Sequence, residues 1–276
     1  MSVAVVTDSA SNLPSGIVAG HDIGVVPMIL KFGDRVLYDG VDFPEGGFYR
    51  ALVEEQVPAS TSAPSVGDFR IAFEAALARA DAVACVTVAS FVSATYEAAT
   101  SAAREFGDRV RIVDSRSASM GEGFVTLEAA RAARAGADLD EVVARAEETV
   151  RRTSLVATIN TFEFLRRSGR VNVVLAYAAT TLNIKPVFAF RGGKLEQLGR
   201  PRTRARALER VVAEARKAAD AGPLHLAIVH ADCADEAAAL GEMLADVPQA
   251  ESLVSEFTPL MGAHTGPGVL GAAFWV

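Results

Sequence analysis

Short apolar runs alternate with helical patterns along the first half of the chain. Residues 3–7 and 82–88 are continuous apolar runs, which are typical of strands buried on both faces of a sheet. Further strands are predicted at residues 23–30, where Pro27 interrupts the run, at 31–38 around a Gly33-Asp34 turn, and at 110–113. Helices are predicted from Leu13-Pro14 and at residues 44–55, 67–80, 95–105, 121–135 and 139–153. This alternation indicates a parallel sheet with helices on both faces.

The pattern changes after residue 153. Strands are predicted at residues 155–159, 184–190, 195–199, 224–230, 251–257 and 272–276, and helices at 203–219 and 235–244. Arg191-Gly192-Gly193-Lys194 is typical of a hairpin turn between two of these strands. We therefore predict an α/β chain of two domains. Residues 1–153 would form a parallel sheet flanked by helices, and residues 154–276 an α/β domain with a mixed sheet.

Three segments are rich in hydroxyl groups. They are Thr61-Ser62-Ala63-Pro64-Ser65, the residues from Ser90 to Tyr96, and those from Asp114 to Gly121. The second lies between a predicted strand and a predicted helix. Hydroxyls and unpaired N–H groups at a helix N-terminus favour a bound anion. Because these segments hold no metal-ligand pattern, they predict a site for a small anionic group held by neutral donors, and a carboxylate fits.

Several polar residues have more than one interpretation. Ser93 could cap the helix, donate to a carboxylate or act as a nucleophile, although no G-x-S-x-G motif surrounds it. His264, in a predicted loop between glycines, could be structural or could donate to a ligand. Asp8 and Asp114 each end a strand, which favours loop capping over acid–base chemistry or magnesium binding.

Composition excludes some classes of function. The 276 residues carry a net charge of −7, which argues against a nucleic-acid partner. Residues 151–217 nevertheless hold 15 Lys and Arg against 4 Asp and Glu, which indicates either a basic face for an acidic partner or phosphate, or a solvated helix surface. Four His and two Cys show no zinc spacing, and no P-loop motif is present, so we expect no metal and no cofactor.

The chain shows no targeting pattern. Its first residues lack the basic flank of a signal peptide, and no apolar run reaches membrane-spanning length. We expect a cytoplasmic protein with at most transient membrane contact.

Seven short blocks carry a resemblance to a known family. They are residues 6–14, Thr61 to Ser65, Ser90 to Tyr96, Val113 to Gly121, Phe164 to Val171, Leu182 to Pro186 and His264 to Gly268. In this order, and over the whole chain, they resemble the motifs of the DegV family. Phe91 and Ala94 depart from the family pattern, in which a glycine occupies the place of Ala94.

The resemblance implies a carrier rather than an enzyme. Members of the family bind fatty acids, and characterised members present the bound acid to a separate fatty acid kinase, which makes acyl phosphate from ATP. It implies a long-chain ligand such as palmitate, stearate or oleate, buried between the domains. The implied ligand-binding residues are Thr61, Ser62, Ser93, Ala94, Gly121, Arg170, Arg202, His264 and Thr265.

Apolar residues at 162–165, 173–177 and 184–190 are candidates for the tunnel wall. Two other functions stay open on the sequence. One is a serine-dependent lipid hydrolase or acyltransferase that uses Ser93 with His264. The weaker one is a sugar- or nucleotide-binding module whose loops hold phosphate.

Overall fold

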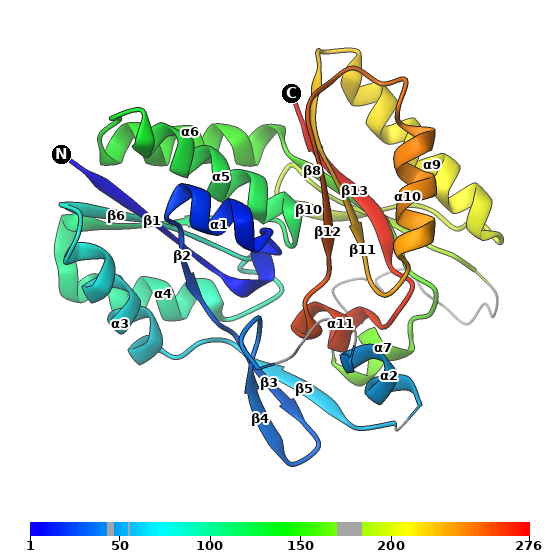
Figure 1. Cartoon of the computed structure of the whole chain (residues 1–276), viewed down its shortest axis with the longest axis horizontal. Coiled ribbons are helices and arrows are strands. Elements are labelled where there is room, and N and C mark those ends of the chain that lie inside the picture. The colour runs from blue at the N-terminus through cyan, green and yellow to red at the C-terminus, as the bar shows by residue number, and fades with distance from the viewer. Residues whose placement is uncertain (43–46, 55, 170–183) are drawn as a thin grey trace.

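A computed structural model describes residues 1–42, 47–54, 56–169 and 184–276. It contains a parallel sheet in the first half of the chain, a small antiparallel sheet beside it and a mixed sheet in the second half (Figure 1). The predicted α/β class is confirmed. The division into domains 1–153 and 154–276 stays a prediction, although the mixed sheet begins at Ser154.

The parallel sheet has the strand order β2-β1-β6-β7. Its strands are Gly24–Val26 (β2), Val3–Asp8 (β1), Ala82–Thr87 (β6) and Val110–Asp114 (β7). Alternate side chains face opposite layers, as in any pleated strand. Val5 packs towards α5 (Met120–Arg134) and α6 (Leu139–Arg152), whereas Val6 packs towards α3 (Val66–Leu77) and α4 (Thr95–Ala103). The prediction of helices on both faces is confirmed.

The small sheet corrects two expectations. It has the order β4-β3-β5, formed by Arg35–Tyr38, Ile29–Phe32 and Ala59–Ser62. The predicted strand at 23–30 is in fact two strands in different sheets, because Pro27 cannot donate to a ladder. The segment around Thr61 was expected to be a loop, which is wrong, since Thr61 pairs with Leu30 in the sheet.

The mixed sheet has the order β10-β9-β8-β13-β11-β12, and only β11 and β12 run parallel. The strands are Lys194–Gly199 (β10), Val187–Arg191 (β9), Ser154–Thr158 (β8), Leu270–Trp275 (β13), Leu224–His230 (β11) and Gln249–Glu256 (β12). Arg204–Ala219 (α9) and Ala234–Met243 (α10) cover one face. The predicted hairpin at Gly192-Gly193 is confirmed.

Short helices complete the fold. They are Ser9–Ser11 (η1), Ser15–His21 (α1), Gly47–Val53 (α2), Arg104–Arg109 (η2), Glu163–Arg167 (α7) and Pro259–Thr265 (α11). The predicted loop around His264 is wrong, because this residue belongs to α11.

Helix α5 lies between the two large sheets (Figure 1). Its side chains from Met120 to Ala130 are all buried, as expected for a helix with a partner on every side. Val125 and Ala129 join the core of the parallel sheet. Met120 and Phe124 join a second core against the mixed sheet. One helix therefore belongs to both halves of the molecule.

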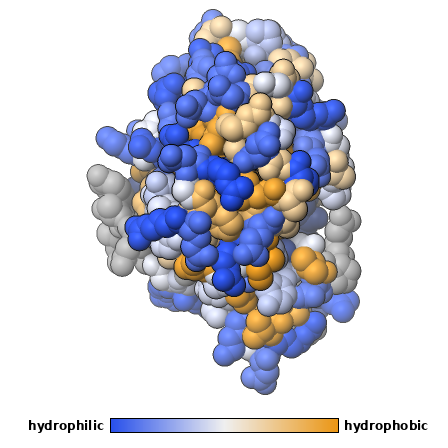
Figure 2. All heavy atoms as spheres, turned by 90° about the vertical axis from the view of Figure 1, so that its left-hand side faces the viewer, coloured by the Kyte–Doolittle hydropathy of each residue, from blue (hydrophilic) through white to orange (hydrophobic). Residues whose placement is uncertain are grey.

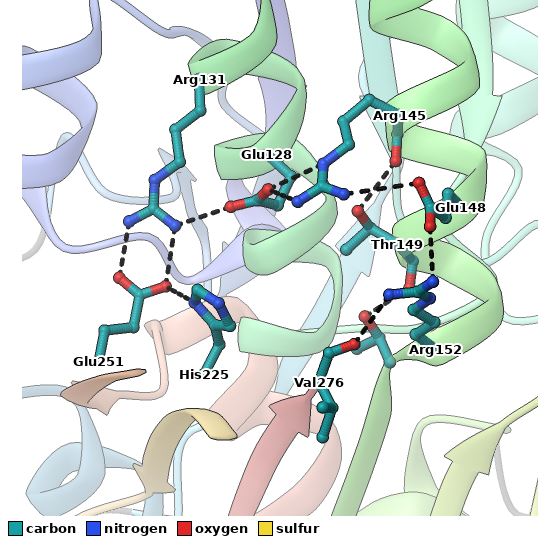
Figure 3. A network of polar contacts seen from close by, with 10 residues as sticks. Glu128, Arg131, Arg145, Glu148, Thr149, Arg152, His225, Glu251 and Val276 are labelled. Carbon is teal, nitrogen blue, oxygen red and sulfur yellow. Dashed lines mark hydrogen bonds and ion pairs between the residues drawn. The ribbon is translucent and has the colours of Figure 1, made fainter. Parts of the chain in front are cut away.

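A polar network joins the same two halves (Figure 3). The two terminal guanidinium nitrogens of Arg131, Nη1 and Nη2, donate to the carboxylate of Glu251 on β12 at 3.0 and 2.7 Å. Arg131 also donates to Glu128 at 2.7 Å, and Glu251 contacts Nδ1 of His225 at 2.6 Å. His225 stacks on Trp275, with 4.1 Å between the ring centroids. The network thus links α5 to β11 and β12.

The surface mixes polar and apolar residues. Figure 2 shows apolar residues in the middle of the face that lies on the left of Figure 1, and again at its lower end. The β3–β4 hairpin projects at that end and exposes Val36, Tyr38 and Val41. None of the helices in the described segments is both long and apolar enough to cross a bilayer.

Candidate functional site

A cavity of about 160 Å³ lies where the loops of the parallel sheet meet the mixed sheet. Of the 21 described residues that line it, 17 are apolar, and the polar ones are Thr61, Ser93, His264 and Thr265. The apolar residues are Ala10, Met28, Ala63, Val88, Val92, Ala118, Leu155, Ala157, Ile159, Leu165, Phe188, Phe190, Leu195, Phe257, Leu260, Met261 and Val269. An apolar cavity with a few polar groups suits a ligand that is mostly hydrocarbon.

The apolar wall follows from strand periodicity. Leu155 and Ala157 on β8, with Phe188 and Phe190 on β9, occupy alternate positions and face the cavity. Val156, between the first two, packs on the opposite face against α9. The candidate wall at 184–190 thus contributes two side chains, and the candidate at 162–165 contributes Leu165. The candidate at 173–177 lies outside the described residues.

The four polar residues come from three elements. Thr61 belongs to β5, Ser93 to the loop before α4, and His264 and Thr265 to α11. Oγ1 of Thr61 and Nε2 of His264 are hydrogen-bonded at 2.8 Å. Ser93 Oγ is 2.8 Å from Oγ1 of Thr95. Hydroxyls and an imidazole offer donors to a carboxylate without placing a fixed positive charge in the cavity.

These contacts decide the interpretation of Ser93. Ala94, not Ser93, is the N-cap residue of α4, and no side chain caps this helix. The capping interpretation is therefore wrong. As a nucleophile, Ser93 would need His264 as its general base. Nε2 of His264 is instead hydrogen-bonded to Thr61, which argues against this role of Ser93.

The loop-capping interpretation of the two aspartates is confirmed. Asp8 accepts hydrogen bonds from the backbone N–H groups of Ala10 and Val88, both at 2.9 Å. Asp114 accepts from Ser90 and from the backbone of Arg116. Ala10 and Val88 both line the cavity, so Asp8 holds two segments of its wall in place.

A second buried aspartate holds another part of the wall. Asp39 accepts a hydrogen bond from the backbone N–H of Leu260 at 3.0 Å, and Leu260 lines the cavity. Burial raises the pKa of Asp39. Sequence reasoning missed this residue, because nothing in the chain connects Asp39 with α11 before folding.

Asp8 and Glu122 of α5 are both fully buried and interact electrostatically with each other. Burial raises the pKa of Asp8 to about 6. Burial, together with the charge of Asp8, raises the pKa of Glu122 well above its usual value. Glu122 Oε1 also accepts from Thr7 at 3.1 Å. We therefore assign the proton of this buried pair to Glu122.

Other predicted site residues do not line the cavity. Ser62 is exposed on β5, and Arg202 is exposed in the turn before α9. Ala94 is exposed with φ −76°, so the alanine is unstrained where the family pattern has glycine. Gly121 is buried in α5, where a Cβ would lie 2.1 Å from Oγ of Ser117. Arg170 lies outside the described residues.

Sequence reasoning also missed Ala10, Met28 and Leu260. The cavity-lining Ala10 and Met28 border the ends of β1 and β2, where loops of a parallel sheet gather. That topological rule is the signal that could have found them. Among the described residues, no group of three or more His, Cys, Asp or Glu could hold a metal ion.

Comparison with known proteins identifies the family. The model for the DegV family of uncharacterised proteins matches residues 2–276. A DegV domain-containing protein of Streptomyces coelicolor is 36% identical over 272 residues, which cover 98% of this chain and 96% of that protein. A DegV domain-containing protein of Mycobacterium tuberculosis is 35% identical over 278 residues, with the same coverage.

Solved structures agree with this result. The chain is similar to a DegV family protein from Thermus thermophilus that is described as binding fatty acid, with a TM-score of 0.92, 31% identity and coverage of 100% of this chain and 99% of that one. It is also similar to DegV of Bacillus subtilis, described as a fatty acid binding protein, with a TM-score of 0.91, 26% identity and the same coverage. The chain therefore belongs to the DegV family.

Proposed function

We propose that this protein is a carrier that binds one long-chain fatty acid such as palmitate, stearate or oleate. The observation that carries the proposal is the composition of the cavity wall, which in the described part of the chain is apolar except for four residues contributed by β5, α11 and the loop before α4. The similar proteins of Thermus thermophilus and Bacillus subtilis, both described as binding fatty acid, support it.

The acyl chain would supply most of the affinity. Each buried CH₂ contributes about 0.8 kcal/mol, so a tail along Leu155, Phe188 and Phe257 outweighs the polar contacts. The carboxylate would accept hydrogen bonds from the hydroxyls of Ser93 and Thr61, with Nε2–H of His264 donating to Oγ1 of Thr61, and these contacts would fix which end of the ligand faces the loops. Thr265, whose hydroxyl donates to the carbonyl of Met261 at 2.9 Å, completes this polar end.

We further propose that a separate fatty acid kinase receives the carboxylate in the cytoplasm and catalyses acyl-phosphate formation. The basic segment 151–217 supports a docking face for an acidic partner. Arg204 pairs with Glu236, and Arg216 pairs with Asp246. Arg202, two residues before Arg204, is exposed. An Arg202→Glu variant should bind fatty acid normally and lose acyl-phosphate formation when the kinase is supplied.

Mass spectrometry tests the central proposal. The purified protein is measured in its native state, then denatured and extracted with organic solvent. A native mass in excess by one fatty acid, and recovery of that acid in the extract, would support the carrier function. Failure to bind fatty acid even after incubation with palmitate, stearate and oleate would refute it. Hydrolysis of an activated ester that Ser93→Ala abolishes would favour the hydrolase instead.

A further inference from the structure

Phe91 connects the two halves of the molecule beside the cavity. It belongs to the loop between β6 and α4, and its ring stacks on Phe190 of β9 with 5.9 Å between centroids and 22° between planes. Phe190 lines the cavity, whereas Phe91 does not, and the side chain of Phe91 is 39% exposed. Phe91 therefore contacts a residue of the cavity wall without belonging to the wall itself.

The loop that carries Phe91 is held in place on both sides of the ring. The backbone N–H and the hydroxyl of Ser90 donate to Asp114 at 3.2 and 2.7 Å. The backbone N–H of Val92 donates to the carbonyl of Ala89 at 3.0 Å, and the N–H of Ala89 donates to Ser117 at 2.8 Å. A restrained backbone leaves the side chain as the part that can move.

Arg116 makes a second contact with the same hairpin. A Cβ at Gly193, in the β9–β10 turn, would lie 2.7 Å from Cδ of Arg116, so the arginine stem packs on the glycine. Asp114 accepts a hydrogen bond from the backbone of Arg116 at 2.8 Å. One carboxylate thus organises both loops that contact the hairpin.

The hairpin forms one side of the cavity. Phe190 on β9 and Leu195 on β10 both line it. Phe190 and Val92 also pack on a small core made of the cavity residues Ala10, Met28, Val88, Ala118 and Leu260. Loosening the hairpin would therefore open the wall without removing any of the four polar residues.

We propose that Phe91, with Arg116, is a latch that holds the β9–β10 hairpin over the cavity and sets the rate at which fatty acid enters and leaves. The inference rests on the proposed function. Because Phe91 does not line the cavity, its contact with Phe190 changes the height of the free-energy barrier both for entry and for release of the fatty acid. It contributes little to the difference in free energy between bound and free ligand. An aromatic stack contributes enough for about a two- to tenfold change in rate.

Stopped-flow fluorescence with cis-parinaric acid tests the latch on the delipidated full chain. Phe91→Ala should speed both association and release of the probe by about two- to tenfold, with the dissociation constant changed less than about twofold. Phe91→Tyr keeps the ring and should behave as the wild type. Ile71→Ala removes a 61% exposed apolar side chain on α3, away from the cavity, and is the matched control.

Two outcomes would overturn the latch alone: unchanged rates in Phe91→Ala, or weaker binding with unchanged association. A wild-type protein that does not bind the probe would overturn the fatty-acid function and the latch together. Gly193→Ala and Gly192→Ala isolate the Arg116 contact, because both glycines have positive φ but only the first would meet Arg116. Gly193→Ala should bind and release cis-parinaric acid faster than Gly192→Ala does. Equal rates in the two variants would overturn the role of Arg116.

Discussion

Replacing Glu122 by Gln should make the protein increasingly stable relative to the wild type as the pH rises. Glu122 is fully buried and its pKa is raised well above 4.5, so the folded state keeps a proton that the unfolded chain releases above about pH 4.5. The stability of the wild type therefore falls by about 1.4 kcal/mol per pH unit from this group, until the folded carboxyl itself ionises. Gln keeps the contact with Thr7, since its amide oxygen accepts the hydrogen bond from the Thr7 hydroxyl.

The expected gain follows from this slope. Relative to the wild type, the free energy of unfolding of Glu122→Gln should rise by about 1.4 kcal/mol for each pH unit above pH 4.5, apart from a constant offset, up to the pH at which the folded carboxyl ionises. Urea denaturation, followed by far-UV circular dichroism and by fluorescence of the buried Trp275, measures both proteins at each pH.

Glu147→Gln is the control, because Glu147 is exposed on the neighbouring helix α6. Its stability curve should run parallel to that of the wild type. A difference between Glu122→Gln and the wild type that is the same at pH 5 and pH 8 would refute the assignment of the proton to Glu122.

Three further predictions concern the cavity and the interface between the halves. Thr61→Val should weaken fatty-acid binding by about tenfold to a hundredfold in isothermal titration calorimetry, because a hydrogen bond to a charged group is lost, while Ser62→Ala on the same strand should bind normally. Ala157→Leu fills part of the cavity and should shift the lipids recovered in mass spectrometry towards shorter chains; an unchanged lipid profile would contradict this placement of the tail. Glu251→Gln should destabilise the protein by about 1–3 kcal/mol at pH 7 in thermal unfolding. Burial raises the pKa of Glu251, but hydrogen bonds from Arg131 and His225 outweigh it and lower the pKa, so the stabilisation is present above pH 4.5 and is lost on further acidification; an equal effect at pH 7 and pH 3 would contradict this.

The sequence predicted the parts of the fold that depend on local patterns. The continuous apolar runs of β1 and β6 and the glycine pair between β9 and β10 each carry their signal within a few residues. The strand β5 was missed because Ala59-Ser60-Thr61-Ser62 has no apolar alternation, and only its pairing with β3 makes it a strand. Pairing with a neighbouring strand thus determined the secondary structure of this segment, in which the local preference for a strand is weak.

The candidate site was predicted in part for the same reason. Thr61, Ser93, His264 and Thr265 come from segments with a recognisable composition, and the fold brings them to one cavity. Asp39 and Glu122 carry no such signal. Each accepts a hydrogen bond from a residue more than a hundred positions away in the chain, Leu260 for Asp39 and Thr7 for Glu122. The packing that buries them is not written in any single stretch of the chain.

Helix α5 makes the two halves of this protein interdependent. A fragment ending at residue 153 would leave Met120, Phe124 and Leu127 without the mixed sheet that buries them. A fragment beginning at residue 154 would expose the other side of the same core. Neither half is thus a module that recombination could transplant alone. The chain should unfold in one cooperative transition, and occupancy of the cavity should shift the melting of both halves together.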